Sequence, residues 1–467
     1  MLQDAKVNQE SAASPRTLVL FNYDWDQVEF SRLAKAYPHD SAGFDLFSFP
    51  SNAHLVGFDM TRFVDALARK AVRSGWQAVV SNHEQFGALA AALLAERMGW
   101  PGTPVNAVLA CQHKHYARQV LQKVCPEANC GFALMPAGYG EPVPEKLPDG
   151  LSYPAFVKPV KAAFSVLART VKDRGELHGH TRFGSWELWV IKRLVEPFER
   201  IARQRMPKLE SSHRMLLEQP LTGDQYNLDG YVLNGQVHLV GMVDAVHYPG
   251  TQSFMRFDYP SKLDKAVQER ALEVARLFLT EIGFTHGFFN MEFFHNPKTD
   301  KLAVIEFNPR LASQFSDLYA RVDGINLHRY AMELGHGRDP ALLPRDVPVA
   351  GAASSFVYRS FVPDAAIHMP NEGQRAALAQ AFPDSQLFCF PKTRGQVLRD
   401  FKWLGSYRYG ILHLGGTDPS ALRQNCERAS ALLGWPAPYA LPVEPLPVPA
   451  HQTRPRRATH PTFTLET

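Results

Sequence analysis

The sequence predicts a multidomain protein of mixed α/β and α+β class, on three grounds. The chain has 467 residues, more than a single hydrophobic core usually supports. Up to about residue 112 the pattern alternates strand, helix and turn, whereas from about residue 151 strands follow one another with turns between them. A third group of strands, with one well-capped helix, lies beyond residue 345.

Residues 16–112 are expected to form a small α/β domain. Residues 17–22 and 77–82 are apolar runs that end in polar residues, as buried parallel strands do where they deliver a loop to a crevice. Apolar residues at helical spacing follow the second run, and Gly99 is placed to end that helix before Pro101.

Residues 113–344 are expected to form a second, strand-rich domain. Prolines and glycines at 136–150 predict an extended connection, and one helix is predicted from Val267 to Ile282 with Gly283 as its C-cap. Residues 345–435 form the predicted third unit, with strands near 354–361, 386–390 and 408–414 and a helix capped by Thr417 or Asp418. Residues 436–467 are expected to be a disordered, proline-rich tail.

Charge and composition argue against several classes of protein. Lys plus Arg total 50 and Asp plus Glu total 46, so the net charge of +4 gives no general basis for binding nucleic acid or a membrane surface. No apolar run reaches the roughly 18 residues that a membrane span needs, and no secretory signal is recognisable. Five irregularly spaced cysteines fit a reducing compartment, so a cytoplasmic protein is expected.

The stretch with the clearest chemical meaning is residues 286–310, where two alternating runs flank the turn Asn-Pro-Lys-Thr-Asp. A hairpin centred near residue 299 places Glu292 opposite Glu306 and Asn290 opposite Asn308. Facing carboxylates repel unless a cation lies between them, and two carboxylates with the Asn308 amide oxygen suit Mg²⁺ or Mn²⁺. The face turned away from them is predicted to form a core from Phe289, Met291, Phe293, Ala303, Ile305 and Phe307. The alternative is that both glutamates are solvated positions on a half-exposed hairpin.

Arg310 follows at once, in the run Glu306-Phe307-Asn308-Pro309-Arg310. A cation and an arginine on one rim form a clamp for polyphosphate. Together with Glu292, this run resembles the metal-binding signature of the ATP-grasp superfamily, which includes biotin carboxylase, carbamoyl phosphate synthase and many carboxylate-amine ligases. The resemblance extends over about residues 17–435, in the order that the family uses.

This resemblance implies a Rossmann-like pre-ATP-grasp domain (16–112), an ATP-grasp nucleotide domain (113–344) and a C-terminal α+β domain (345–435). It also implies ATP and Mg²⁺ or Mn²⁺ as cofactors, with Glu292, Glu306 and Asn308 as metal ligands. Arg310 would be the catalytic residue that stabilises the transferring phosphoryl group. The expected nucleotide contacts are the phosphate-binding lysines Lys114 and Lys158, the phosphate-covering loop with Lys161 and Ser165, the adenine hinge with Glu218 and Leu221, and the ribose position at Asp224 or Gln225.

Two departures from the family pattern shape the functional prediction. The loop from Lys161 to Ser165, KAAFS, lacks a glycine-rich run, so fewer bare backbone amides can approach phosphate. Biotin carboxylases have a glutamate four residues after the signature arginine, where this chain has Gln314, and an amide cannot act as that base.

The predicted function is therefore an ATP-dependent carboxylate-amine ligase that joins two small molecules through an acyl phosphate. The alternatives are a biotin-carboxylase-like enzyme that activates bicarbonate, or a nucleotide-binding regulatory protein without turnover. A homodimer is one alternative for the oligomeric state.

Overall fold

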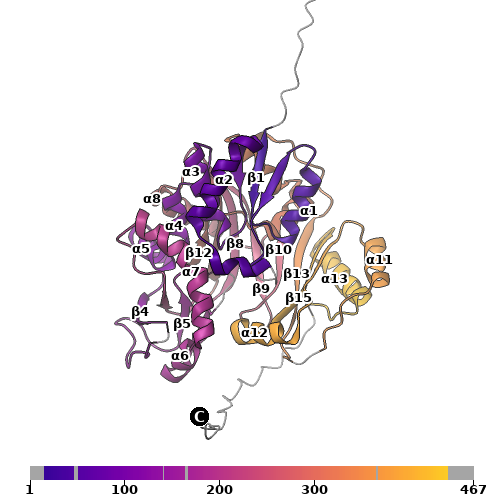
Figure 1. The fold of residues 1–467 in the computed structure, drawn as a ribbon. Helices are drawn as coiled ribbons and strands as arrows, with labels where there is room; N and C mark the ends of the chain where they lie inside the picture. Colours follow the sequence, from indigo (N-terminus) through magenta and orange to yellow (C-terminus); the bar gives the residue numbers. More distant parts are fainter. Residues whose placement is uncertain (1–14, 47–50, 140, 163–166, 364–365, 440–467) are drawn as a thin grey trace, which may run out of the picture.

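The computed structural model describes residues 15–46, 51–139, 141–162, 167–363 and 366–439, and the strands of this part form three sheets. Figure 1 shows the N-terminal elements at the top, a four-stranded sheet at the lower left and the C-terminal elements on the right. Ser165 and residues 440–467 of the predicted tail lie outside the described residues. The described start of that tail packs on the body, where the Tyr439 and Phe356 ring centres lie 5.7 Å apart.

The N-terminal sheet is parallel, with the strand order β2-β1-β3. Strands β1 (Arg16–Leu20) and β3 (Trp76–Val80) confirm the two predicted apolar strands. Strand β2 (His39–Ala42) was not predicted, because its residues are polar or small and carry no apolar run. The helices of this region are α1 (Asp24–Leu33), α2 (Met60–Ser74) and α3 (Gly87–Met98), and Gly99 ends α3 in the left-handed conformation as predicted.

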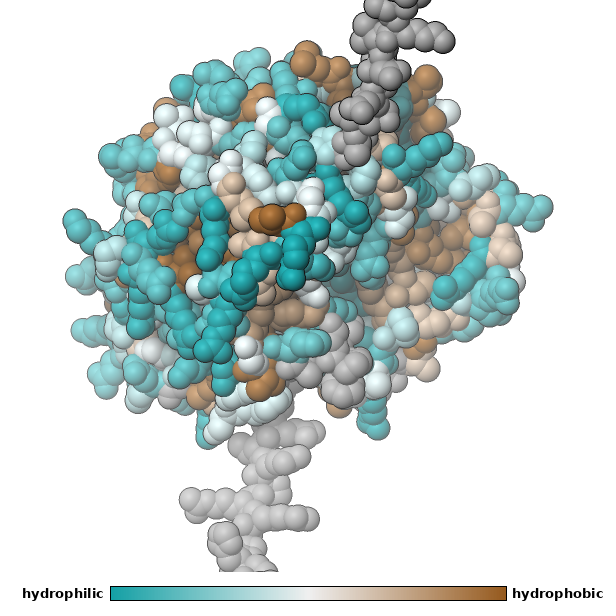
Figure 2. All heavy atoms as spheres, turned by 45° about the horizontal axis from the view of Figure 1, so that its top comes forward, coloured by the Kyte–Doolittle hydropathy of each residue, from teal (hydrophilic) through white to brown (hydrophobic). Residues whose placement is uncertain are grey.

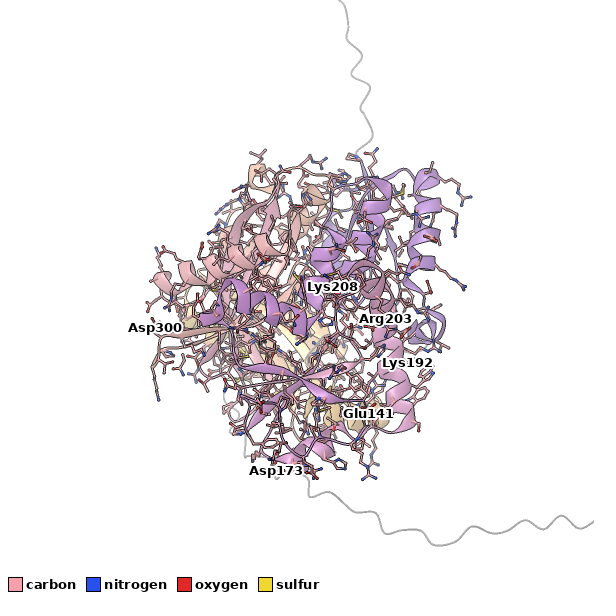
Figure 3. The ribbon with its side chains drawn as sticks, turned by 90° about the vertical axis from the view of Figure 1, so that its left-hand side faces the viewer. Glu141, Asp173, Lys192, Arg203, Lys208 and Asp300 are labelled. Atoms are coloured by element: carbon pink, nitrogen blue, oxygen red, sulfur yellow. The ribbon has the colours of Figure 1, made fainter. Side chains whose placement is uncertain are left out.

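Two helices, α4 (Val105–Gln112) and α5 (Lys114–Val124), lead to an antiparallel sheet with the order β4-β7-β5-β6. Its strands are β4 (Phe132–Gly138), β5 (Ala155–Pro159), β6 (Arg169–Val171) and β7 (Arg214–Glu218). Figure 3 labels Glu141 and Asp173 in this lower part and Lys192 and Arg203 on the helix beside it.

That helix, α7 (Ser185–Arg205), and the shorter α6 (Arg174–Thr181) contradict the expectation of a single helix in this region. Pro197 lies inside α7 and charged residues alternate with the apolar ones, which obscured its helical period. The period is nevertheless present, since Ile191, Val195 and Phe198 are all buried.

The largest sheet has eight strands in the order β12-β11-β8-β9-β10-β13-β15-β14. The strands run over β8 (Asp224–Leu233), β9 (Gln236–His247), β10 (Phe254–Tyr259), β11 (Gly287–Asn296), β12 (Lys301–Asn308), β13 (Ala352–Ser360), β14 (Gln386–Cys389) and β15 (Tyr407–Gly416). This sheet continues across residue 345 because β10 pairs with β13. The division of the chain into three domains remains a prediction.

Helices cover this sheet and complete its cores. They are α8 (Lys265–Glu281), α9 (Ser316–Asp323), α10 (Leu327–Gly335), α11 (Glu372–Ala381), α12 (Arg394–Leu404) and α13 (Pro419–Leu433). Phe278 of α8 stacks on Phe307 of β12 with ring centres 3.8 Å apart, which fixes the core side of the β11–β12 hairpin. Gly283 follows α8 in the left-handed conformation, and Asp418 caps α13 through the amides of Ser420 and Ala421.

Figure 2 shows a mostly hydrophilic face with smaller groups of apolar side chains. None of the helices in the described part of the chain is long and apolar enough to cross a membrane.

Candidate active site

The β11–β12 hairpin pairs Asn290 with Asn308 and Glu292 with Glu306, which confirms the predicted register. Asp300, in the turn of this hairpin, lies at the outer edge of the molecule (Figure 3). The core face carries Phe289, Met291, Phe293 and Phe307, all buried, so the two glutamates extend from the opposite face.

The prediction that Ala303 and Ile305 belong to the core face was wrong. A β-bulge after Glu292 pairs Phe293 with Val304 instead of Ile305, so the alternation of β12 shifts by one residue. Leu302 and Val304 therefore fill the core, and Ile305 is only half-buried. Pattern reading alone assumed uninterrupted alternation and missed the extra residue.

The three predicted metal ligands lie together. Glu292 accepts hydrogen bonds from Gln225 Nε2 at 3.0 Å and from Asn308 Nδ2 at 3.2 Å. Asn308 Nδ2 also donates to Asn290 Oδ1 at 3.1 Å, so its amide hydrogens are used within the protein and its Oδ1 is left as a potential ligand. Two carboxylates and one amide oxygen fit a hard divalent cation completed by water and phosphate oxygens.

The pKa values of the two carboxylates shift in opposite directions. Burial raises the pKa of Glu292, and the facing Glu306 carboxylate raises it further. Burial alone would also raise the pKa of Glu306, but Lys114 and Lys158 outweigh it and hold that pKa below its usual value. The Lys114 ammonium, in the first turn of α5, lies 2.8 Å from Glu306 Oε2 and also donates to the Ala162 carbonyl at 2.9 Å. A positive charge thus already lies against this carboxylate pair.

Lys158 and Glu218 belong to a buried ion triad with Arg118, whose role was not predicted from the sequence. Glu218 lies 3.0 Å from Lys158 Nζ and 2.7 Å from Arg118 Nε. Arg118 also donates to Asn129 Oδ1 and to the carbonyls of Val304 and Ile305, and Lys158 donates to the Ile305 carbonyl. Burial would raise the pKa of Glu218, but the two cations lower it to about 2, so the triad keeps a net positive charge.

The remaining residues predicted to contact the nucleotide differ in burial and in their contacts with the site. Lys161 is buried above the Phe198 ring of α7 at 5.1 Å, and burial lowers its pKa to about 8. Gln225 is buried against Glu292, whereas Asp224 is exposed at the start of β8. Leu221 is half-buried in the loop between β7 and β8. Asp224 and Leu221 are therefore near the site in the chain but not tied to it by hydrogen bonds among the described residues.

Arg310 pairs with a residue that the sequence patterns did not single out, Glu84. Arg310 Nε lies 3.1 Å from Glu84 Oε2, and Gln112 Nε2 donates to Glu84 Oε1 at 2.9 Å. Glu84 Oε2 receives no hydrogen bond from a described residue, so the contact with Arg310 is a charge pair without hydrogen-bond geometry. A signal for Glu84 did exist, because it comes shortly after the carboxyl end of the buried parallel strand β3.

A buried polar chain supports Asn308 from behind. Asn290 Nδ2 donates to Asp229 Oδ1 at 3.0 Å, and the Tyr319 hydroxyl donates to Asp229 Oδ2 at 2.7 Å. Asn290 in turn accepts from Asn308, so Asp229 orients the amide of that potential ligand through one intermediate. Sequence reasoning missed Asp229 and Tyr319, which lie 90 residues apart in the chain.

The side-chain amide of Gln314 is held by a hydrogen bond within the protein. Its Nε2 donates to Ser355 Oγ at 2.9 Å, which engages the amide in a contact between the segment after β12 and strand β13. This is the position at which a biotin carboxylase would carry its basic glutamate.

Comparison with known proteins finds a domain family that matches the central part of the chain. Residues 151–317 match the ATP-grasp domain family. A segment of 264 residues, 55% of this chain, is 27% identical to carnosine synthase 1 of Gallus gallus. The match spans only 27% of that longer protein.

Solved structures show the same fold over most of the chain. An L-amino acid ligase from Bacillus licheniformis superposes with a TM-score of 0.66, covering 90% of this chain and 97% of its own at 14% identity. The N5-carboxyaminoimidazole ribonucleotide synthetase of Thermus thermophilus gives a TM-score of 0.58, with 92% and 100% coverage and 16% identity. A biotin carboxylase from Campylobacter jejuni gives 0.55, with 89% and 91% coverage and 14% identity. At these identities the similarity establishes the fold.

Proposed function

We propose that this chain, whose residues 151–317 match the ATP-grasp domain family, is an ATP-dependent carboxylate-amine ligase. The observation that carries the proposal is the pairing of Glu292 with Glu306 beside Asn308, within reach of Lys114 and Arg310. The relatives named as carnosine synthase and L-amino acid ligase favour amino acids as substrates.

ATP is held in this proposal by positive charge and by a buried hinge. Lys158 and Arg118 leave a net positive charge around Glu218, which favours a polyphosphate. Lys114 and Lys161 add cationic groups near the metal face, and Gln225 or Asp224 would contact the ribose. Mg²⁺ or Mn²⁺ held by Glu292, Glu306 and Asn308 would neutralise charge on the phosphates.

Catalysis then rests on positioning. The carboxylate of one substrate attacks the γ-phosphorus of ATP, the bond to the bridging oxygen breaks, and ADP leaves with the electron pair. The amine of the second substrate attacks the acyl carbon, phosphate leaves, and the nitrogen loses its proton. Arg310, oriented by Glu84, stabilises the negative charge of both steps, and no covalent enzyme intermediate is required.

The biotin-carboxylase alternative requires a base for bicarbonate. Gln314 cannot take a proton, and its amide is engaged with Ser355. A substrate that is already a carboxylate needs no such base in the first step. The regulatory alternative predicts nucleotide binding without ATP consumption.

The deciding experiment measures ADP release against mixtures of amino acids and small carboxylic acids, with mass spectrometry of the products. The proposal expects ADP and an amide in equal amounts, the amide having the summed mass of the two substrates less one water. Turnover that depends on bicarbonate and biotin alone would support the carboxylase instead, and nucleotide binding without turnover under any mixture would support the regulatory protein.

A further inference from the structure

Within the described part of the chain, an arginine at the start of β15 has no acidic partner of its own. Arg408 is half-buried with its guanidinium 4.5 Å from the centre of the Phe390 ring, and it forms no ion pair with a carboxylate among the described residues. The Asp400 and Asp24 carboxylates act on it electrostatically, and the Tyr23 side chain is a further near neighbour. Asp400 is already paired with Lys392 at 2.5 Å, so it is only partly available to Arg408.

A second arginine stands beside it. Arg359 of β13 is the register partner of Arg408, so both side chains leave the same face of the sheet. Arg359 donates only to neutral acceptors among the described residues, Ser406 Oγ at 2.9 Å and the Phe254 carbonyl at 3.3 Å. Burial lowers the pKa of Arg359 to about 10, and the neighbouring Arg408 contributes to that lowering. Asp400 acts electrostatically on both arginines, but it is ion-paired with Lys392, so the two guanidinium groups are only partly neutralised and an anion would complete the site.

Other buried or half-buried arginines of the described chain show the contrast. Arg118 is paired with Glu218, Arg310 with Glu84 and Arg321 with Asp317. Arg256, on the neighbouring strand β10, is paired with Asp258 at 2.9 Å. Arg408 is therefore better suited than Arg256 to receive an anion from outside the chain.

The position of Arg408 connects it with the active site. Asp24 and Tyr23 follow the carboxyl end of strand β1, and Tyr23 is also an electrostatic neighbour of Arg310 and Glu84. Strand β14, beside β15, contacts α1 directly, since Gln386 Nε2 donates to Glu29 Oε1 at 3.1 Å. Arg408 thus belongs to the junction where the N-terminal sheet, the signature arginine and the C-terminal strands meet.

We propose that Arg408, with Phe390 beneath it and Arg359 next to it, binds the free carboxylate of an amino-acid acceptor. This inference rests on the proposed ligase function and names the acceptor class. The donor carboxylate, which reacts with ATP, must lie beside the proposed metal ligands and Arg310. A separate arginine such as Arg408 therefore suits the acceptor carboxylate, which does not react. An amino-acid acceptor has such a group, because only its amine attacks the acyl carbon.

The first test needs no variant. The wild-type protein is assayed with one carboxylate donor and with an acceptor offered as the free amino acid or as its carboxamide. The proposal expects the carboxamide to have a KM at least about 10-fold higher, because it lacks the charge that pairs with a guanidinium. Equal KM values for the two acceptors would overturn it.

The second test removes the guanidinium. Arg408→Met should raise the KM for the amino acid at least about 10-fold and leave the carboxamide unchanged, while Arg408→Lys should retain part of the affinity. Arg423→Met, on the exposed face of α13, is the matched control and should change neither value. If Arg408→Met raised the KM for the donor instead, Arg408 would belong to the donor site and the proposal would be wrong.

Hydroxylamine separates this inference from the ligase function itself. It attacks an acyl phosphate to give a hydroxamate and phosphate, and it carries no carboxylate. Hydroxamate formation should be the same in the wild type and in Arg408→Met, which also shows that the variant is folded. If no carboxylic acid gives hydroxamate in the wild type, the ligase function fails and the acceptor site fails with it. If hydroxamate forms but Arg408→Met leaves the amino-acid KM unchanged, only the acceptor site is wrong.

Discussion

The β11–β12 hairpin and the junction around Arg310 both bury charged side chains, but they balance charge in different ways. In the hairpin, Glu292 and Glu306 face each other across neighbouring strands and require external positive charge, which Lys114 supplies in part. At the junction, Arg310 is paired with Glu84, which follows a strand of a different sheet, whereas Arg408 has no ion pair with an acid among the described residues. A cation would therefore balance the charge of the hairpin and an anion would balance that of the junction, as the proposed site for ATP, a metal ion and a second carboxylate would require.

The largest effect is expected on the hairpin side. Glu306→Gln should lower Mg²⁺-dependent ATP turnover by about 10² to 10³, because it removes the carboxylate that Lys114 contacts and that a metal would use. Steady-state ADP release measures this loss, and circular dichroism should show an intact fold. Glu281→Gln, on the surface of α8, is the control and should turn over normally. Wild-type turnover in Glu306→Gln would show that Glu306 is not a metal ligand.

The contrast between the two regions also explains what the sequence could predict. The hairpin is local, so alternation and one turn were enough to predict that Glu292 lies opposite Glu306. The β-bulge that leaves Ile305 without a partner on β11 was not predicted, because a single extra residue does not change the composition of the strand. Contacts such as Arg310 with Glu84 join residues far apart in the chain and on different sheets, and no local period encodes them.

The C-terminal strands illustrate the same limit. Strands β13, β14 and β15 were predicted close to their observed positions, because each contains neighbouring apolar or aromatic residues in a short run. Their pairing with β10 was not predicted, since hydrogen bonding between strands depends on the arrangement of the whole chain. The local sequence around Arg408 does not distinguish it from an ordinary charged residue, because its register partner Arg359 and its charged neighbours come from distant parts of the chain.

The second prediction concerns the stability contributed by the buried triad of Arg118, Lys158 and Glu218. Arg118→Met should reduce the free energy of unfolding by about 3 to 5 kcal/mol, because it breaks a buried ion pair and leaves two backbone carbonyls without their donor. Lys158→Met should cost less, since Arg118 still neutralises Glu218 in that variant. Denaturant unfolding compares the two variants with Arg276→Met, a surface control. An equal or smaller loss for Arg118→Met than for Lys158→Met would contradict this ranking.

The third prediction tests the pairing at the junction. Glu84→Gln should lower kcat by about 10-fold, because Arg310 loses the charge that fixes its position while Gln112 can still hydrogen-bond the amide. Nucleotide affinity should change little, since no described hydrogen bond or ion pair joins Glu84 to the triad that holds the hinge. Single-turnover kinetics and nucleotide titration separate the two quantities. Glu96→Gln on α3 is the control, and a loss confined to nucleotide binding would assign Glu84 to a different role.

The smallest effect is expected from pH and concerns Lys161. Burial lowers the pKa of Lys161 from its ordinary 10.5 to about 8, so the side chain is cationic below pH 8 and neutral above it. Nucleotide binding that uses this charge should therefore weaken as pH rises through about 8.

Stability should move in the opposite direction between pH 8 and 10.5. There the unfolded chain binds more protons than the folded one at this position, so the contribution of Lys161 to the free energy of unfolding rises with pH. Lys161→Arg should keep its charge between about pH 7 and 9, because an arginine guanidinium has a much higher ordinary pKa than a lysine ammonium. The wild type should thus show a several-fold rise in the KM for ATP between about pH 7 and 9, and Lys161→Arg should show a flatter profile. Parallel profiles for the two proteins would mean that Lys161 does not contact the nucleotide in its charged form, and that the alkaline loss comes from another group.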